Sequence, residues 1–255
     1  MNYARAAWNW GQVAGEAMIY GGIALTVGMV PKARRLRSWC MHRWCAGSAD
    51  RIKLRRHLYN GELLDEVPQA ILVANHLSSL DILLIGSYLR RDFRWLAKAA
   101  LFKVPISGWF LSTAGHIRVH RGDQAHSRNK SIREQVHQVV GEGASVLYFP
   151  EGTRSRTGEL TEFRMGAFLA AVREGLPILP LVVRGTNEVM EAGAKDLSVK
   201  PDRSCSLTVL PPISLDAIGA SGDEGDRAAR LRDLTWQLIA DELNRDATNA
   251  TAAAS

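Results

Sequence analysis

The stretch ILVANHLSSLDILLIG, residues 71–86, contains two apolar runs that are separated by the polar segment NHLSSLD, residues 75–81. The first run is short and rich in aliphatic side chains, which predicts a buried strand over Ile71–Asn75. The second run is longer and predicts a helix over Leu80–Leu89. A strand, a turn and a helix in this order form the repeating unit of an α/β fold.

The same alternation continues along the chain beyond residue 65. Further strands are predicted over Phe93–Lys98, His116–Arg121, Ser145–Pro150, Ile178–Val183 and Ser206–Leu210. Further helices are predicted over Leu101–Ser112, Ser127–Val140, Met165–Arg173 and Asp226–Leu243. This pattern predicts a single α/β domain with a mostly parallel mixed sheet flanked by helices. In such sheets, ligands bind beyond the carboxyl ends of the strands.

His76 and Asp81 lie on either side of the turn, at the end of the predicted strand and in the first turn of the predicted helix. Both side chains can therefore face one crevice. A carboxylate bound to one imidazole nitrogen fixes the tautomer and leaves the other nitrogen to accept a proton, as a general base does. Ser78 and Asp81 also match an S-x-x-D capping box, in which the acid only stabilises the helix start. These seven residues alone favour neither interpretation.

A second polar segment follows a predicted strand in LYFPEGTRSR, residues 147–156. After Pro150 it offers a glycine for close backbone approach, a hydroxyl group, and an arginine that can hold a phosphate with two hydrogen bonds. A surface turn with a solvated Glu–Arg pair would explain the same residues. The occurrence of both polar segments at strand ends is what predicts a site.

These segments resemble sequence motifs of the 1-acylglycerol-3-phosphate O-acyltransferases, the PlsC-like glycerolipid acyltransferases. The first motif, N-H-x-x-x-x-D, is Asn75, His76 and Asp81, and the third, F-P-E-G-T-R-S, is intact over Phe149–Ser155. The second block resembles KAALFKVPISGWFLSTAGHIRVHR, with matches at Lys98, Leu101, Pro105, Gly108, Gly115, Ile117 and Arg121. The fourth resembles LPILPLVV, residues 176–183. The four motifs occur in order across the predicted domain.

The resemblance implies a role for each of these positions. His76, oriented by Asp81, would take the proton from a lysophospholipid hydroxyl as that oxygen attacks an acyl thioester on coenzyme A or acyl carrier protein. Lys98 and nearby backbone amides would stabilise the oxyanion. The residues implied to hold the phosphate or glycerol of the acceptor are Glu151, Gly152, Thr153, Arg154 and Arg121. No cofactor or metal is expected, because the thioester is a substrate and because His116 and His120 lack a third ligand at a natural spacing.

The reaction implied by the resemblance is acyl transfer to the sn-2 hydroxyl of 1-acylglycerol 3-phosphate, which gives phosphatidic acid. Another lysolipid, such as a lyso-ornithine lipid, stays open as the acceptor, because Arg164 replaces a lysine that is commoner in the family and because the N-terminal segment is unusual. The apolar block Leu101–Phe110 would line a channel for the acyl chain or, equally, form a buried core helix. A non-catalytic lipid-surface binding protein is the alternative from another class. A serine hydrolase would need a G-x-S-x-G nucleophile elbow, and the sequence has none.

The first 57 residues differ from the rest of the chain in charge and aromatic content. They hold ten Lys/Arg against two acids and four of the seven tryptophans, and so carry a formal charge of +8, whereas the whole chain carries +6. Val13–Val30 is apolar apart from Glu16, and the run after that acid is shorter than the roughly 20 residues that a spanning helix needs. We therefore predict that it dips into a bilayer without crossing it.

The next segment, PKARRLRSWCMHRWC, residues 31–45, predicts a helix in the headgroup plane of a membrane. Its apolar face would carry Leu36, Trp39, Cys40 and Trp44. The alternative is a soluble amphipathic helix whose tryptophans pack on the domain.

These predictions divide the chain into an N-terminal membrane-associating helical segment (1–57), a glycerolipid acyltransferase domain (58–244) and a disordered tail (245–255). The expected partners are membrane lipids, the lysophospholipid acceptor, and acyl-CoA or acyl carrier protein. Nucleic acid is not expected, because the basic charge is confined to one segment. The expected location is the inner (plasma) membrane, where the protein would be peripheral or monotopic on the cytoplasmic face.

Overall fold

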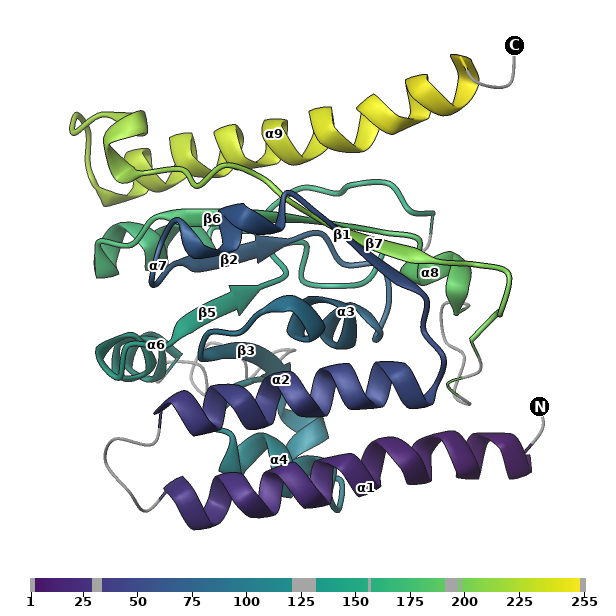
Figure 1. The fold of residues 1–255 in the computed structure, drawn as a ribbon. Coiled ribbons are helices and arrows are strands. Elements are labelled where there is room, and N and C mark those ends of the chain that lie inside the picture. Colours follow the sequence, from purple (N-terminus) through teal and green to yellow (C-terminus); the bar gives the residue numbers. More distant parts are fainter. Residues whose placement is uncertain are drawn as a thin grey trace.

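The computed structural model describes residues 3–28, 34–120, 132–155, 157–190, 197 and 199–252, and a seven-stranded sheet lies at its centre (Figure 1). The strands are β1 (Arg56–Tyr59), β2 (Ile71–Ala74), β3 (Phe93–Lys98), β4 (Ile117–Val119), β5 (Ser145–Tyr148), β6 (Ile178–Arg184) and β7 (Cys205–Val209). Their order is β1-β7-β6-β2-β5-β3-β4, and every pairing in the sheet is parallel except that of β6 with β7. The predicted mostly parallel mixed sheet is confirmed.

Helices cover both faces of this sheet (Figure 1). One layer consists of α1 (Tyr3–Gly28), α2 (Arg34–Arg51), α3 (Asp81–Tyr88) and α4 (Ser107–Thr113). The other layer consists of α6 (Ile132–Gly141), α7 (Gly166–Glu174) and α9 (Glu224–Ala252). Short helical segments are η1 (Gly61–Asp65), η2 (Ala99–Lys103), α8 (Thr186–Val189) and η3 (Leu215–Ile218).

The β2 strand shows why both layers are needed. All four of its side chains are buried, and they alternate between two separate hydrophobic cores. Leu72 and Ala74 pack under α2 and α3, whereas Ile71 and Val73 pack under α7. A strand that is covered on both faces must be apolar throughout, and this accounts for the uninterrupted run in the sequence.

The structure differs from the predicted helix over Leu101–Ser112 and shows which elements contain two predicted domain boundaries. The helix predicted over Leu101–Ser112 is two segments, η2 and α4, because Pro105 interrupts the pattern and Ile106 takes a positive φ of 65°. The domain boundary at 57/58 falls inside β1, a partly exposed strand at the sheet edge whose charged sequence gives little strand signal. The tail predicted from residue 245 is helical to Ala252, because it contains alanines and neither glycine nor proline to end α9.

The N-terminal segment forms two helices that pack side by side and against the domain (Figure 1). Within the described residues, no helix is long and apolar enough to cross a membrane. Glu16, the single acid of the apolar run, is buried between the helices, where it accepts a hydrogen bond from Arg51. Val13 and Ala17 are buried in the same core as Met41 of α2.

The single apolar face that the sequence predicts for α2 is divided in the structure. Cys40 is buried, and the Trp44 ring packs on Phe110 of α4 with 4.6 Å between ring centroids. Leu36 and Trp39 are exposed instead. Thus one part of the helix packs on the domain, as in the alternative interpretation, and another part faces outward.

Candidate active site

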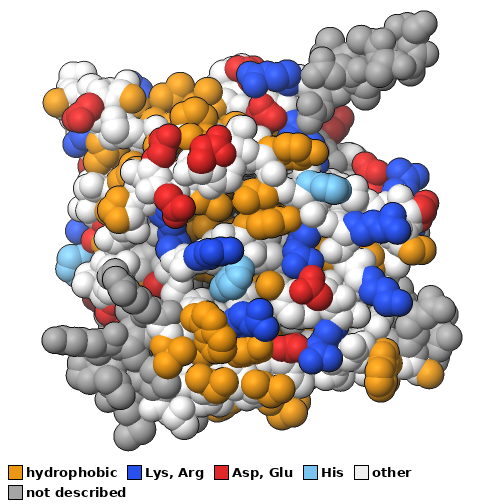
Figure 2. Space-filling model, viewed as in Figure 1, with side chains coloured by type: hydrophobic (Ala, Val, Ile, Leu, Met, Phe, Trp, Pro, Cys, Tyr) orange, Lys and Arg blue, Asp and Glu red, His pale blue; other side chains and the backbone are white. Residues whose placement is uncertain are grey.

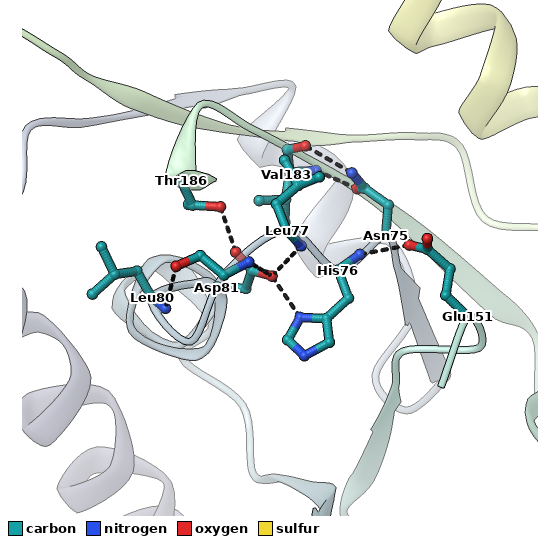
Figure 3. Close-up of polar contacts among 9 residues, drawn as sticks. Asn75, His76, Leu77, Leu80, Asp81, Glu151, Val183 and Thr186 are labelled. Carbon is teal, nitrogen blue, oxygen red and sulfur yellow. Dashed lines mark hydrogen bonds and ion pairs between the residues drawn. The ribbon is translucent and has the colours of Figure 1, made fainter. Parts of the chain in front are cut away.

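The His76 ring and the Asp81 carboxylate are in direct contact (Figure 3). His76 follows β2 and Asp81 begins α3, so the turn between these elements sets their spacing. The distance from Nδ1 of His76 to Oδ2 of Asp81 is 2.7 Å. With the carboxylate on Nδ1, Nε2 lies on the side of the ring away from Asp81, where it is free to exchange a proton (Figure 3).

The Asp81 carboxylate is fully buried, and both of its oxygens are bound. Oδ2 also accepts hydrogen bonds from the backbone N–H groups of Leu77 (2.8 Å) and Ser78 (3.0 Å). Oδ1 accepts one from the hydroxyl of Thr186, at 2.5 Å. Four donors therefore fix the carboxylate, and the carboxylate in turn fixes the imidazole.

The two interpretations of the turn, catalytic pair and capping box, prove to be compatible. The Asp81 carboxylate reaches back to the Ser78 N–H, as the acid of a capping box does. The Ser78 hydroxyl accepts a hydrogen bond from the Leu80 N–H (3.3 Å) and makes no cap to the first helical turn. One carboxylate oxygen thus stabilises the turn and binds the histidine at the same time.

Glu151 of the FPEGTR segment connects this turn to the neighbouring strand end. One carboxylate oxygen accepts a hydrogen bond from the backbone N–H of His76 at 2.7 Å (Figure 3). The other accepts hydrogen bonds from the hydroxyl and the N–H of Thr161. Burial raises the pKa of Glu151, and these hydrogen bonds oppose the rise. Both oxygens are engaged within the protein, so a direct contact of Glu151 with substrate stays a prediction.

The Asn75 side chain holds β2 against β6 at the same edge of the sheet. Its amide nitrogen donates to the carbonyl of Val183 (2.9 Å), and its amide oxygen accepts from the Val183 N–H (2.7 Å). The side chain therefore continues the hydrogen-bond ladder between the two strands by one step. This aligns His76, the next residue, with the residues that follow β6.

A cavity of about 570 Å³ opens beside the His76 ring. Its lining residues come from the ends of β2, β3, β4 and β5 and from the start of α7: His76, Leu96, Lys98, Val119, His120, Tyr148, Phe149, Pro150, Gly152, Thr153, Arg164, Gly166 and Ala167. The ring of Phe149 stacks on His76, with centroids 4.1 Å apart. The site thus lies beyond the carboxyl ends of parallel strands, where the fold class predicts it.

The structure brings most of the predicted site residues together. Lys98, Gly152 and Thr153 line the cavity with His76. The side chain of Arg154 is exposed and lies outside this lining, and Arg121 lies outside the described residues. Within the described part of the chain, no side chain of the block at residues 101–110 lines the cavity either.

Two residues were not predicted by the sequence reasoning as members of the site. Thr186 follows β6, which is adjacent to β2, so its position depends on a strand order that the sequence does not show. Arg164 lines the cavity beside Gly152, where a Cβ would approach the guanidinium carbon to 2.8 Å. Gly152 also has a positive φ of 73°, so a side chain would be strained there as well as too close. In the sequence, Arg164 is distinguished only as the replacement of a lysine that is commoner in the family.

A family model described as "Acyltransferase" matches residues 55–184, which include His76, Asp81 and every residue that lines the cavity. The chain belongs to the acyltransferase family. Its sequence is 36% identical over 144 residues to a 1-acyl-sn-glycerol-3-phosphate acyltransferase of Chlamydomonas reinhardtii, a match that covers 56% of this chain and 42% of that protein. It is 29% identical over 184 residues to the protein of that name from Escherichia coli, with 72% of each covered.

A solved acyltransferase has the same fold. The 1-acyl-sn-glycerophosphate (LPA) acyltransferase PlsC of Thermotoga maritima superimposes with a TM-score of 0.73 over 95% of this chain and 96% of the other, at 22% identity. Several plant and algal relatives are longer, and the matched region covers less than half of them: 42% of the Chlamydomonas protein and 39% of a chloroplastic relative in Arabidopsis thaliana. Family and fold are thereby established from two independent comparisons.

Proposed function

We propose that the protein transfers a fatty acyl chain from an acyl thioester to the sn-2 hydroxyl of 1-acylglycerol 3-phosphate, forming phosphatidic acid. The observation that carries the proposal is the His76–Asp81 contact of 2.7 Å at the mouth of a cavity that also contains Lys98 and Arg164. Relatives named 1-acyl-sn-glycerol-3-phosphate acyltransferase support this choice of reaction.

The chemistry begins at the acceptor hydroxyl. Nε2 of His76 takes its proton while the oxygen attacks the thioester carbonyl, and Asp81 stabilises the imidazolium that forms. The tetrahedral intermediate then collapses: an oxygen ester forms, the carbon–sulfur bond breaks, and the imidazolium returns the proton to the leaving sulfur. The step needs no acyl-enzyme and no resident cofactor, because the thioester of coenzyme A or acyl carrier protein arrives as a substrate.

The charges of the cavity suit the two anionic centres of this reaction. Lys98, at the end of β3, is the candidate for stabilising the oxyanion. Arg164 and the backbone around Gly152 and Thr153 are candidates for the acceptor phosphate, because a guanidinium binds phosphate with two parallel hydrogen bonds. We assign Arg154 a secondary part in phosphate binding, since its side chain is exposed outside the cavity lining.

The proposal is tested with purified protein, labelled acyl-CoA or acyl carrier protein, and a panel of acceptors. The panel contains 1-acylglycerol 3-phosphate, its counterpart without phosphate, and a lyso-ornithine lipid. We expect transfer to the phosphate-bearing acceptor, with new ester only at the sn-2 position. Faster transfer to the lyso-ornithine lipid would reassign the acceptor, and no transfer to any acceptor would contradict the reaction class.

We further propose that the outer surface of α1, α2, η2 and α4 rests on a membrane, on the cytoplasmic side as its positive charge predicts. The exposed large apolar side chains of these elements and of the link between η2 and α4 are Trp8, Trp10, Met18, Ile19, Leu36, Trp39, Leu101, Val104, Ile106 and Trp109. Trp109 also touches α1, because its ring lies where a Cβ on Gly21 would be 2.7 Å away. Exposed apolar side chains on neighbouring helices are typical of a protein that lies on a bilayer.

Point substitutions test this contact better than truncation, because α2 covers buried side chains of α3. We expect the double variant Trp8→Ser/Ile19→Ser to sediment less with phospholipid vesicles than the wild type. Leu234→Ser, at an exposed leucine on α9 across the sheet, is the matched control. Equal sedimentation of the double variant and the control would place the membrane contact elsewhere.

A further inference from the structure

A second cavity, of about 600 Å³, lies near the amino ends of the strands, whereas His76 lies at their carboxyl ends. Its lining residues are Ser38, Trp39, His42 and Arg43 of α2, with Pro68, Arg90, Arg91, Asp92 and Gly143 from the segments before β2, β3 and β5. The active-site cavity, in contrast, is lined by residues in and after the carboxyl ends of these three strands, together with residues of β4 and α7. Because these strands are parallel, the two cavities lie at opposite ends of the strands and cannot hold the same small ligand.

The second cavity is strongly basic. Three of its lining residues are Arg43, Arg90 and Arg91, and the one lining acid, Asp92, is already bound by the buried guanidinium of Arg94. The Arg90 guanidinium is exposed and has no hydrogen-bond or ion-pair partner among the residues that the structure describes. The Arg43 side chain is hydrogen-bonded to Tyr20, a neutral partner that leaves the positive charge of Arg43 in place. An excess of positive charge around one hollow is a recognition surface for an anion, and arginine suits phosphate in particular.

Parts of this surface are fixed in place by the fold. Arg91 donates to the Val67 carbonyl at 2.6 Å, and the Ser38 hydroxyl donates to the Arg90 carbonyl at 2.7 Å. The second of these bonds ties α2 to the segment before β3, so the spacing of the arginines does not depend on flexible side chains alone. Burial lowers the pKa of His42, and the positive charges of Arg90 and Arg43 lower it further.

The position of the cavity favours a lipid over a soluble anion. Trp39 lines it and is 46% exposed, and its ring contacts Tyr20 of α1 edge to face, with 5.7 Å between centroids. Figure 2 shows Lys/Arg and His side chains beside hydrophobic ones on the face over α2. Tryptophan beside arginine is typical of the headgroup region of a bilayer. This step rests on the proposed membrane contact of α1 and α2, whereas the charge of the cavity does not.

We propose that this cavity binds the phosphate of an anionic phospholipid headgroup, as a second lipid site that is separate from the acceptor site. Arg43 and Arg90 would hold the phosphate oxygens from α2 and from the α3–β3 segment, and Trp39 would lie against the glycerol and the start of the acyl chains. A lipid held there would fix the rotation of the protein on the membrane.

The test compares binding of the full chain to vesicles of phosphatidylcholine alone and of phosphatidylcholine with phosphatidylglycerol. For Arg43→Gln/Arg90→Gln we expect about thirtyfold weaker binding to the anionic vesicles, from the loss of two charges near the membrane, and unchanged binding to the neutral ones. Lys53→Gln/Arg55→Gln removes the same charge from exposed positions after the other end of α2. That control should stay within about threefold of the wild type, because diffuse charge is screened by salt.

Two further measurements separate specific lipid binding from simpler explanations. Arg43→Lys/Arg90→Lys keeps both charges but loses the planar guanidinium groups, and we expect it to bind several-fold more weakly than the wild type. Inorganic phosphate should not displace the protein from anionic vesicles. An equal loss in the Lys53/Arg55 control would overturn the proposal in favour of general surface charge, and displacement by inorganic phosphate would overturn it in favour of a soluble anion.

A matched control keeps this result distinct from the proposed acyl transfer. Acyl transfer in detergent micelles, where no bilayer is present, should be unchanged in Arg43→Gln/Arg90→Gln, because neither arginine lines the active-site cavity. Loss of that activity together with lipid binding would overturn the claim that the two sites are separate.

Discussion

His76 and His137 each contact a carboxylate at a similar distance, and the two pairs differ in the surroundings of the histidine and in what holds the carboxylate. Nδ1 of His76 is 2.7 Å from Asp81, and Nδ1 of His137 is 2.9 Å from Glu174. The His137 side chain is 79% exposed on the outside of α6, whereas that of His76 is 20% exposed beside a cavity. A short histidine–carboxylate distance therefore does not by itself indicate a general base.

The difference lies in what holds the carboxylate. Asp81 is fully buried and receives three further hydrogen bonds, from two backbone N–H groups and from Thr186. These bonds fix its position before any substrate arrives, so the imidazole is oriented at no further entropic cost. The ring of His137 lies largely in solvent, where one ion pair contributes little. The predictions below test whether this environment, and not the contact, produces activity.

Removing the charge of each carboxylate should give the largest contrast. Asp81→Asn keeps the size of the side chain but cannot stabilise the imidazolium, so we expect acyl transfer to fall by about 10²–10⁴. Glu174→Gln makes the same change in the His137 pair, which lies away from the cavity, and should leave the rate unchanged. The measurement is kcat for both variants with one acceptor, and comparable losses in the two would remove the distinction between the pairs.

Removing one donor to Asp81 should have an intermediate effect. Thr186→Val preserves the shape of the side chain but leaves Oδ1 without its hydroxyl partner, which costs about 1–3 kcal/mol of unfolding free energy. We expect kcat to fall about tenfold because the carboxylate is less well fixed, with little change in KM. Thr186→Ser should restore both values. A variant with normal kcat would show that the backbone N–H groups alone position Asp81.

The smallest effect concerns Glu151, which supports His76 through the backbone. Burial raises its folded pKa above the ordinary 4.5, so the folded protein binds this proton more tightly than the unfolded chain does. Its contribution to stability is therefore complete below the unfolded pKa and is lost as the pH rises through the folded value. Relative to Glu151→Gln, the wild type should lose unfolding free energy over that range.

Denaturant unfolding of both proteins at several pH values measures this difference. Glu159→Gln, at an exposed glutamate in the same loop, serves as the control and should show no such trend. Parallel stability curves for wild type and Glu151→Gln would show that the carboxylate titrates alike in the folded and unfolded states.

The part of the site that could be predicted from sequence is the part that is local. His76 and Asp81 belong to one strand–turn–helix unit, so their spacing fixes their contact once β2 and α3 are recognised. The contact of Thr186 with Asp81 could not be predicted from local spacing, because it depends on β6 lying beside β2. The spacing of motifs along the chain does not predict the order of strands in a sheet. Local patterns predict elements and turns, whereas contacts across the sheet depend on its topology.

The N-terminal helices show the same limit for packing. The sequence places Leu36, Trp39, Cys40 and Trp44 on one face of α2, and the structure divides that face between the core and the surface. Periodicity shows which side chains point in similar directions, but it does not show which of them a neighbouring helix buries. Here α1 and α4 cover Trp44 and leave Trp39 exposed.

The most direct test of the account is acyl transfer to 1-acylglycerol 3-phosphate by His76→Ala and His137→Ala, assayed side by side with the wild type. Both variants should remain folded, since neither side chain lies in a hydrophobic core. We predict a loss of at least about 10²–10⁴ for His76→Ala, the usual contribution of a general base, and no loss for His137→Ala. Near-normal turnover by His76→Ala would contradict the account, because the buried pair would then be a structural feature of the turn.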